Sequence, residues 1–173
     1  MITSKIEDFE EYSAVNKNVH YIIPVPDAKQ FGVSFARNTA IDIGEYLLSI
    51  EKNVPWIWIL DDNIQQFFKI SCTGEEKISF LEALKLVEDD AFPRDRFACI
   101  SFQKRGHHSK HRKGNCQKLF ELAPAKCIFF LNLKLIGPLR FDIMENVGED
   151  FVFFYDLMTQ NMEEHGEICR VCR

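Results

Sequence analysis

The chain has 173 residues, 46% of them hydrophobic, which is enough for a single domain, residues 1–173, with a substantial core. The formal net charge is −5, and no apolar run reaches the roughly 20 residues that a membrane-spanning helix needs. Residues 1–18 are polar and are expected to be peripheral, and their acidic start is not the pattern of a secretory signal. Six cysteines are spread through the chain, several inside apolar stretches. These features predict reduced thiols and an intracellular protein of the cytoplasm or nucleus, without membrane contact.

The first expected strand covers residues 21–26, where an apolar run ends at Pro24 and Pro26. Proline cannot donate to the ladder of a central strand, so the strand stops there. From Ser34, which can act as a cap, apolar side chains recur at helical spacing and predict a helix that reaches residue 50. Its expected apolar face consists of Ala36, Ala40, Ile43, Leu47 and Ile50.

Arg37 and Asn38 fall in the first turn of this helix, near the positive end of the helix dipole. A cation is electrostatically unfavourable at that position. An anionic ligand such as a diphosphate would resolve the conflict. The pair therefore indicates either a ligand contact or an ordinary surface feature.

The next element is an aromatic and apolar run, residues 54–60, which predicts a buried strand because it has no polar face. It ends in Asp61, Asp62 and Asn63. Ligands of open α/β sheets bind at the carboxyl ends of strands, and paired acids at that edge can hold a divalent cation. The alternative is a loop in which Asp61 caps a helix.

Downstream, the hydrophobic pattern predicts an amphipathic helix, two apolar strands and a final buried helix, at residues 79–89, 96–103, 125–136 and 149–158. The first turn of the final helix carries Glu149 and Asp150, which the helix dipole also favours without any catalytic role.

A basic stretch, residues 94–118, holds eight Lys and Arg against one acid, Asp95. Its larger part is the basic loop 104–118, whose three histidines and Cys116 do not match a zinc spacing and lie among cations that oppose a metal. The loop is either a solvated surface feature or a surface for a phosphate-bearing ligand or acceptor. Cys169 and Cys172 form a lone CxxC without the second pair of a zinc site.

Taken in order, these features resemble the GT-A class of nucleotide-sugar glycosyltransferases, by the Pro-x-Pro strand end and by Ala36-Arg37-Asn38, Leu60-Asp61-Asp62-Asn63 and Gly148-Glu149-Asp150. More narrowly, Phe31–Asn38 and Trp56–Asn63 resemble the TET-associated glycosyltransferases. The resemblance covers residues 21–158. It implies an α/β fold of the nucleotide-diphospho-sugar transferase type, a three-layer sandwich with a mixed, mainly parallel central sheet.

The resemblance also implies a metal-dependent hexosyltransferase that moves a sugar from a nucleoside-diphosphate donor, UDP-linked, to a hydroxyl acceptor with inversion. Asp61 and Asp62 would hold Mn²⁺ or Mg²⁺, which stabilises charge on the departing diphosphate, and His165 would be a third ligand. Asn63 stands where many relatives have a further acid, which implies weak metal affinity.

Asp150 is the implied general base, and Glu149 would orient it or bind acceptor hydroxyls. Donor contacts are implied for Pro24, Arg37, Asn38 and Asp61.

The alternative function is a non-catalytic glycosyltransferase-like module that binds nucleic acid or an acidic partner through residues 94–118. A nucleotidyltransferase is disfavoured because no glycine-rich phosphate loop follows the first strand. The acceptor stays open among a modified DNA base, a protein hydroxyl and a glycan, and the basic loop favours a phosphate-bearing one.

Overall fold

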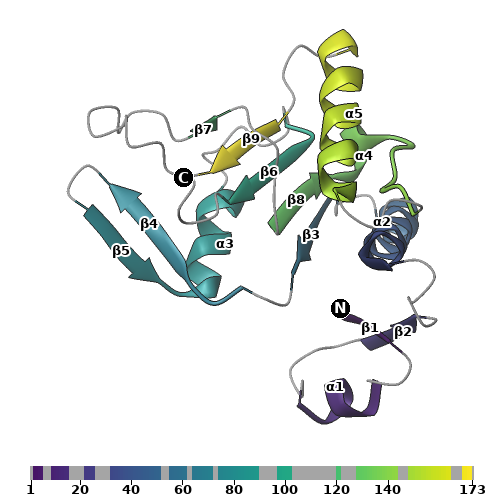
Figure 1. Ribbon diagram of the computed structural model, residues 1–173, viewed down its shortest axis with the longest axis horizontal. Helices are drawn as coiled ribbons and strands as arrows, with labels where there is room; N and C mark the ends of the chain where they lie inside the picture. Colours follow the sequence, from purple (N-terminus) through teal and green to yellow (C-terminus); the bar gives the residue numbers. More distant parts are fainter. Residues whose placement is uncertain are drawn as a thin grey trace.

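The computed structural model describes residues 2–5, 9–15, 22–25, 32–51, 55–61, 64–71, 74–89, 97–102, 120–121, 128–143, 148–164 and 169–172. In chain order the elements are β1 (Ile2–Lys5), α1 (Phe9–Val15), β2 (Ile22–Val25), α2 (Gly32–Ile50), β3 (Trp56–Leu60), β4 (Phe67–Ser71), β5 (Gly74–Ile78), α3 (Phe80–Glu88), β6 (Cys99–Phe102), β7 (Phe120–Glu121), β8 (Ile128–Asn132), α4 (Leu133–Ile136), α5 (Glu149–Glu164) and β9 (Cys169–Cys172) (Figure 1). Within these ranges, none of the helices combines the length and the apolar composition that crossing a bilayer requires.

The largest sheet has five strands in the order β3-β8-β6-β9-β7. Strand β8 runs antiparallel to both of its neighbours, β7 runs antiparallel to β9, and only β6 and β9 pair in parallel. The prediction of a GT-A sandwich with a mainly parallel central sheet is therefore wrong. The strand that contains Pro24 is β2, which is not part of this sheet and pairs with β1 in a separate two-stranded sheet, with Ser4 opposite Pro24.

The error has a physical cause. A continuous apolar run shows that both faces of a strand are covered, and such runs are typical of parallel sheets. All five residues of β8 are indeed buried. Burial on both faces does not determine strand direction, however, and here it results from helices that cover both sides of an antiparallel core.

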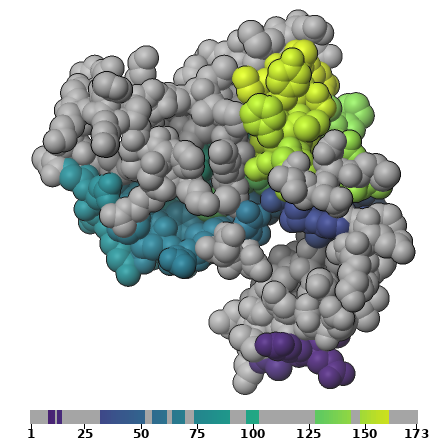
Figure 2. Space-filling model, in the orientation of Figure 1, coloured from purple at the N-terminus to yellow at the C-terminus, as the bar shows by residue number. Residues whose placement is uncertain are grey.

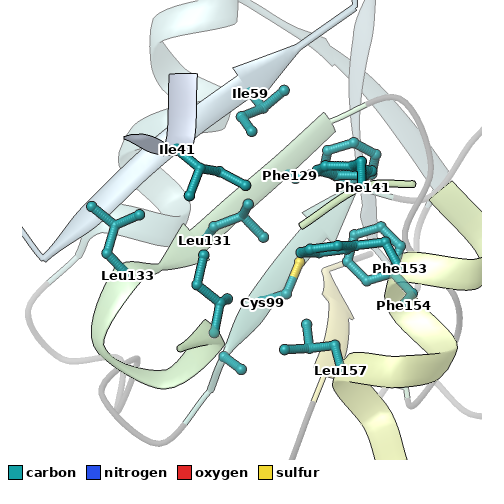
Figure 3. Packing of buried hydrophobic residues seen from close by; sticks show 12 residues of the cluster. Ile41, Ile59, Cys99, Phe129, Leu131, Leu133, Phe141, Phe153, Phe154 and Leu157 are labelled. Carbon is teal, nitrogen blue, oxygen red and sulfur yellow. The ribbon is translucent and has the colours of Figure 1, made fainter. Parts of the chain in front are cut away.

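The first face of this core packs against α2, α4 and α5. Side chains that share this face lie opposite one another in the sheet, as Ile59 does with Phe129, and Cys99 with Leu131. Helix α2 adds Ile41, and α5 contributes Phe153, Phe154 and Leu157. Figure 3 shows these side chains converging from the strands and both helices into one apolar cluster.

The opposite face of the sheet carries an aromatic stack and is covered by α3. Phe130 lies between Trp56 and Trp58, with ring centroids 4.5 and 4.3 Å apart. Val87 of α3 packs into the same cluster, and the Trp58 indole N–H donates to Glu88 at 2.7 Å. Successive side chains of the central strands thus pack alternately on the two faces of the sheet, as the two-residue period of a strand requires.

Helix α3 confirms the element expected from Ser79. The helix expected from Ser34 is present as α2, but it begins at Gly32, so Ser34 lies inside the helix and is not its cap, and Arg37 lies beyond the first turn. Ser79 caps α3 by accepting a hydrogen bond from the backbone N–H of Glu82, whose side chain accepts one from the Ser79 backbone. These hydrogen bonds lower the pKa of the Glu82 carboxyl. The strand expected over residues 125–136 ends earlier, because the Asn132 side chain accepts from Lys134 N and starts α4.

Helix α2 approaches the sheet closely at Gly44, which is buried. A Cβ at this position would lie 2.8 Å from Ile57 Cγ2 and 3.0 Å from Leu133 Cδ1. Because Ile57 Cγ2 belongs to a β-branched strand residue, it cannot move aside by a simple rotation. Glycine therefore sets the distance between α2 and β3.

We expect Gly44→Ala to lower the free energy of unfolding by about 1 to 3 kcal/mol through overpacking, even though alanine favours helix by about 1 kcal/mol. Chemical denaturation measures the change. The matched control is a double-mutant cycle with Ile57→Ala, which removes the clashing methyl and should reduce the penalty. An equally or more stable Gly44→Ala protein would contradict the close approach.

Candidate functional site

The best-defined polar cluster is built around Arg37, which lies on the sheet-facing side of α2 and is only 6% exposed. Its Nη2 donates to Asp61 Oδ1 at 3.0 Å, and its Nη1 donates to Glu149 Oε1 at 2.9 Å. Asp61 follows β3, and Glu149 opens α5. One guanidinium therefore joins two acids that lie far apart in the sequence, and we call these three residues the Arg37 triad.

Two neighbouring aromatic rings, with centroids 6.1 Å apart, pack against the guanidinium. Arg37 Cζ lies 5.1 Å from the ring centroid of Phe129 and 5.1 Å from that of Phe141. Both distances are within the range of cation–π attraction, which strengthens when the cation is shielded from water. The rings cover one side of the guanidinium, so Arg37 is held by packing as well as by charge.

The neighbouring Asn38 connects α2 to the segment after α4. Its side-chain amide donates to the Phe141 carbonyl, and its side-chain oxygen accepts from the Phe141 N–H, both at 2.8 Å. Arg140 adds ion pairs to Asp42 and Glu45 on the same helix. These contacts hold Phe141 in place over Arg37, so Asn38 supports the triad through backbone contacts.

Asp61 also lines a cleft with a volume of about 660 Å³, which lies between the end of β3, the β4–β5 hairpin and the start of α3. This volume is in the range of small-molecule sites. The Asp61 side chain is 21% exposed. Its Oδ2 accepts no hydrogen bond from the part of the chain that the structure describes, so this oxygen can still accept one from a ligand. The cleft lining combines apolar and polar side chains, namely Leu60, Asp61, Ile64, Gln65, Gln66, Phe67, Lys77, Ile78, Ser79 and Phe80.

Helix α5 begins after Gly148, whose φ of 88° lies in the left-handed region that suits glycine. Its first residues differ in environment. Glu149 points inward to Arg37 with a side chain only 12% exposed, whereas Asp150 accepts a hydrogen bond from the Phe151 N–H at 2.8 Å. Asp150 Oδ2 has no hydrogen-bond partner among the described residues. Figure 2 shows α5, in yellow, at the molecular surface.

The structure brings together three of the residues singled out from sequence, Arg37, Asp61 and Glu149, with Asn38 and Asp150 adjacent to them in the chain. Pro24 is in β2 and pairs with β1. Asp62, His165 and the basic loop 104–118 lie outside the described residues. Cys169 and Cys172 are the two ends of β9.

The described part of the site does not fit a divalent cation held between Asp61 and Glu149. The Arg37 guanidinium already bridges these carboxylates through Asp61 Oδ1 and Glu149 Oε1, and its positive charge opposes a second cation between them. Nowhere in the described ranges do three His, Cys, Asp or Glu side chains gather in a way that could hold a metal. A metal site at this edge therefore depends on Asp62.

Two features of the site are not evident from local sequence patterns. Phe129 and Phe141 belong to different segments, and their meeting over Arg37 depends on the tertiary fold. Lys77 reaches the cleft because β5 folds back on β4. A usable signal did exist for the inward position of Arg37, because Ser34, Arg37, Ile41 and Gly44 recur at helical spacing and form the buried stripe of α2.

We expect Arg37→Met to lower the free energy of unfolding by about 3 to 5 kcal/mol, because two shielded carboxylates would lose their counter-ion. The control is Arg140→Met, whose partners Asp42 and Glu45 are 64% and 36% exposed. Loss of these exposed ion pairs is worth about 0 to 1 kcal/mol. Denaturant titration of both variants measures the difference, and equal destabilisation would contradict a special role for the triad.

Comparisons with protein-family models, curated proteins and solved structures give no significant match to this chain. The features that bear on the chemistry of the site are therefore the triad, the adjacent cleft and Asp150. The resemblance to glycosyltransferases remains a prediction from sequence.

Proposed function

We propose that this protein transfers a sugar from a nucleoside-diphosphate sugar, UDP-linked, to a hydroxyl acceptor. The observation that carries the proposal is the Arg37 triad, which ties the acid at the edge of the cleft to the first residue of α5. Asp150, the candidate base, follows Glu149 directly in the chain, and Glu149 is joined through Arg37 to the cleft-lining Asp61. A transferase needs such an arrangement, because the base must reach the acceptor hydroxyl while the oxygen of that hydroxyl faces the anomeric carbon of the donor.

In the proposed reaction the acceptor hydroxyl oxygen attacks the anomeric carbon of the donor. The bond between that carbon and the diphosphate oxygen breaks, and the diphosphate leaves with the bonding electrons. Asp150 takes the acceptor's proton on Oδ2, the oxygen that does not accept from Phe151 N. Direct attack from the face opposite the leaving group inverts the anomeric configuration.

The remaining members of the site have positioning roles in this proposal. Arg37 is buried against two rings with both terminal nitrogens engaged, so it holds Asp61 and Glu149 and does not itself bind the donor. Glu149, fixed by Arg37, sets the position at which α5 starts and hence the place of Asp150. Asp61 offers its second oxygen to hydroxyl groups in the cleft.

A divalent cation, Mn²⁺ or Mg²⁺, would supply Lewis-acid stabilisation of the departing diphosphate. Asp62 is the residue proposed to hold it, since Asp61 Oδ1 is already paired with Arg37. We place the reaction in the cytoplasm or nucleus, whose reducing conditions keep thiols such as the buried one of Cys99 from being oxidised.

The general-base role is tested with Asp150→Asn. We expect transfer to fall by roughly 100-fold or more, as for removal of a general base, while the dissociation constant for UDP changes little. Hydrolysis and transfer assays with a panel of UDP-sugars, together with calorimetry, give both quantities. Asp156→Asn, which changes an exposed acid further along α5, is the control. Unchanged transfer in Asp150→Asn would overturn the assignment.

The role of Asp62 is tested by metal removal. With Mn²⁺ present, we expect UDP to raise the melting temperature of the protein, because a ligand of the native state stabilises it. EDTA or Asp62→Ala should abolish most of that shift. Asp89→Ala, at the end of α3, is a matched control in which the shift should persist. A UDP effect that survives both EDTA and Asp62→Ala would rule out the metal site.

A further inference from the structure

Lys77 is the only cation among the described residues that line the cleft. It lies on β5, the outer strand of the β4–β5 hairpin, and is exposed. The described lining contains one acid, Asp61, whose Oδ1 is directed at Arg37. A ligand in the cleft therefore meets a compensated carboxylate at the β3 end and, on the hairpin, an ammonium group that no carboxylate of the described residues pairs with.

The position of Lys77 is not explained by stabilisation of the hairpin. In the β4–β5 register Lys69 lies opposite Glu76, a cross-strand pair of opposite charge, which typically stabilises a hairpin by a few tenths of a kcal/mol. Lys77 lies opposite Phe68. No carboxylate in the described part of the chain lies within ion-pair distance of Lys77.

The rest of the cleft limits the kind of ligand. Its apolar wall includes Ile78 and Phe80, and Phe80 is 43% exposed. Gln65 offers an amide that can both donate and accept. A ligand that fits has hydroxyl groups to donate to Asp61 Oδ2, a ring that can lie on Phe80, and an anionic group near Lys77.

We propose that the cleft binds a phosphorylated sugar, with a phosphoryl group on Lys77 and sugar hydroxyls on Asp61. The inference deepens the proposed function, on which it rests, by assigning a recognition residue to the substrate. The same chemistry is present in the ribose diphosphate of a nucleotide donor and in a phosphosugar acceptor. Lysine suits either source, because it binds phosphate as a point charge.

The experiment measures binding to the full chain by calorimetry in the presence of Mn²⁺, with UDP and with glucose 6-phosphate as separate probes. We expect at least one probe to bind and its affinity to fall about tenfold or more in Lys77→Gln, the size of effect for a hydrogen bond to a charged group. Lys77→Arg should retain most of the affinity. Lys69→Gln, which removes the other lysine of the same hairpin, should leave the affinity unchanged.

The two probes separate the sources of the phosphoryl group. Lys77-dependent binding of UDP alone assigns the cleft to the donor, and Lys77-dependent binding of glucose 6-phosphate alone assigns it to the acceptor. Binding of both through Lys77 supports a shared phosphoryl site. The proposal is overturned if neither probe binds, if Lys77→Gln binds as tightly as the unaltered protein, or if Lys69→Gln weakens binding as much.

The outcome is independent of catalysis. Sugar transfer that is observed together with unaltered binding in Lys77→Gln would remove this inference and leave the proposed function intact. Lys77-dependent binding without any sugar transfer would support the phosphoryl site and count against the proposed transferase function. Because Lys77 is exposed, Lys77→Gln is expected to fold normally, and a thermal melt of each variant checks this.

Discussion

The buried interaction between one guanidinium and two carboxylates is the constraint on which the site depends. Arg37, Asp61 and Glu149 together carry one net negative charge, and their side chains are 7%, 21% and 12% exposed. Removing such charges from water costs several kcal/mol per ion unless they are paired. The chain offsets that cost with two direct hydrogen bonds and two aromatic rings. The end of β3 and the start of α5 must therefore meet at α2 in the folded protein.

Helix α2 can serve as this meeting point only if its distance and rotation are fixed. Gly44 sets the distance, because any side chain would meet Ile57 and Leu133. Asn38 limits rotation through its paired hydrogen bonds to the Phe141 backbone. The same contacts place Phe141 over Arg37, so a single arrangement of packing and hydrogen bonding determines the geometry of the charged site. A site supported in this way is more precisely positioned than one carried by loops.

Sequence reasoning succeeded where the deciding forces are local. The helix predicted over residues 79–89 is present as α3, and the capping box at its start joins Ser79 and Glu82, which are only three positions apart. For α2 the element was correct but its buried face was rotated: Leu47 and Ile50, expected inside, are 42% and 60% exposed, and Arg37 lies inside. Hydropathy scales rank arginine as a surface residue. A prediction from hydrophobic periodicity therefore leaves Arg37 out of the buried face of α2 unless its two counter-ions are known. Those counter-ions come from distant segments.

The prediction of strand direction failed for a related reason. Burial is a property of each residue, whereas pairing direction depends on how distant segments meet, and β8 is buried on both faces while antiparallel to both neighbours. The resemblance to GT-A enzymes implied a mainly parallel sheet and also a set of acids at one site. The sheet is not as implied, so the site has to be judged separately from the fold. The acids at the end of β3 and at the start of α5 converge through Arg37 in a sheet of different topology. Function is argued from a site rather than from a fold, and here the convergence of those acids stands on contacts that do not depend on strand direction.

The arrangement also divides the site into two mechanically distinct parts. The triad belongs to the α2 and α5 face of the sheet, whose core includes Phe129 and Phe153. The hairpin that supplies Lys77 is attached to the other face, where Phe67 packs with Ala83 of α3 and Ile128. Asp61 lines the cleft beside this hairpin and is also paired with Arg37. Ligand affinity can therefore change through the hairpin while the charged cluster stays fixed, because the two parts share the sheet but not their packing. Such a division allows recognition to vary without disturbing the acids at which chemistry would occur.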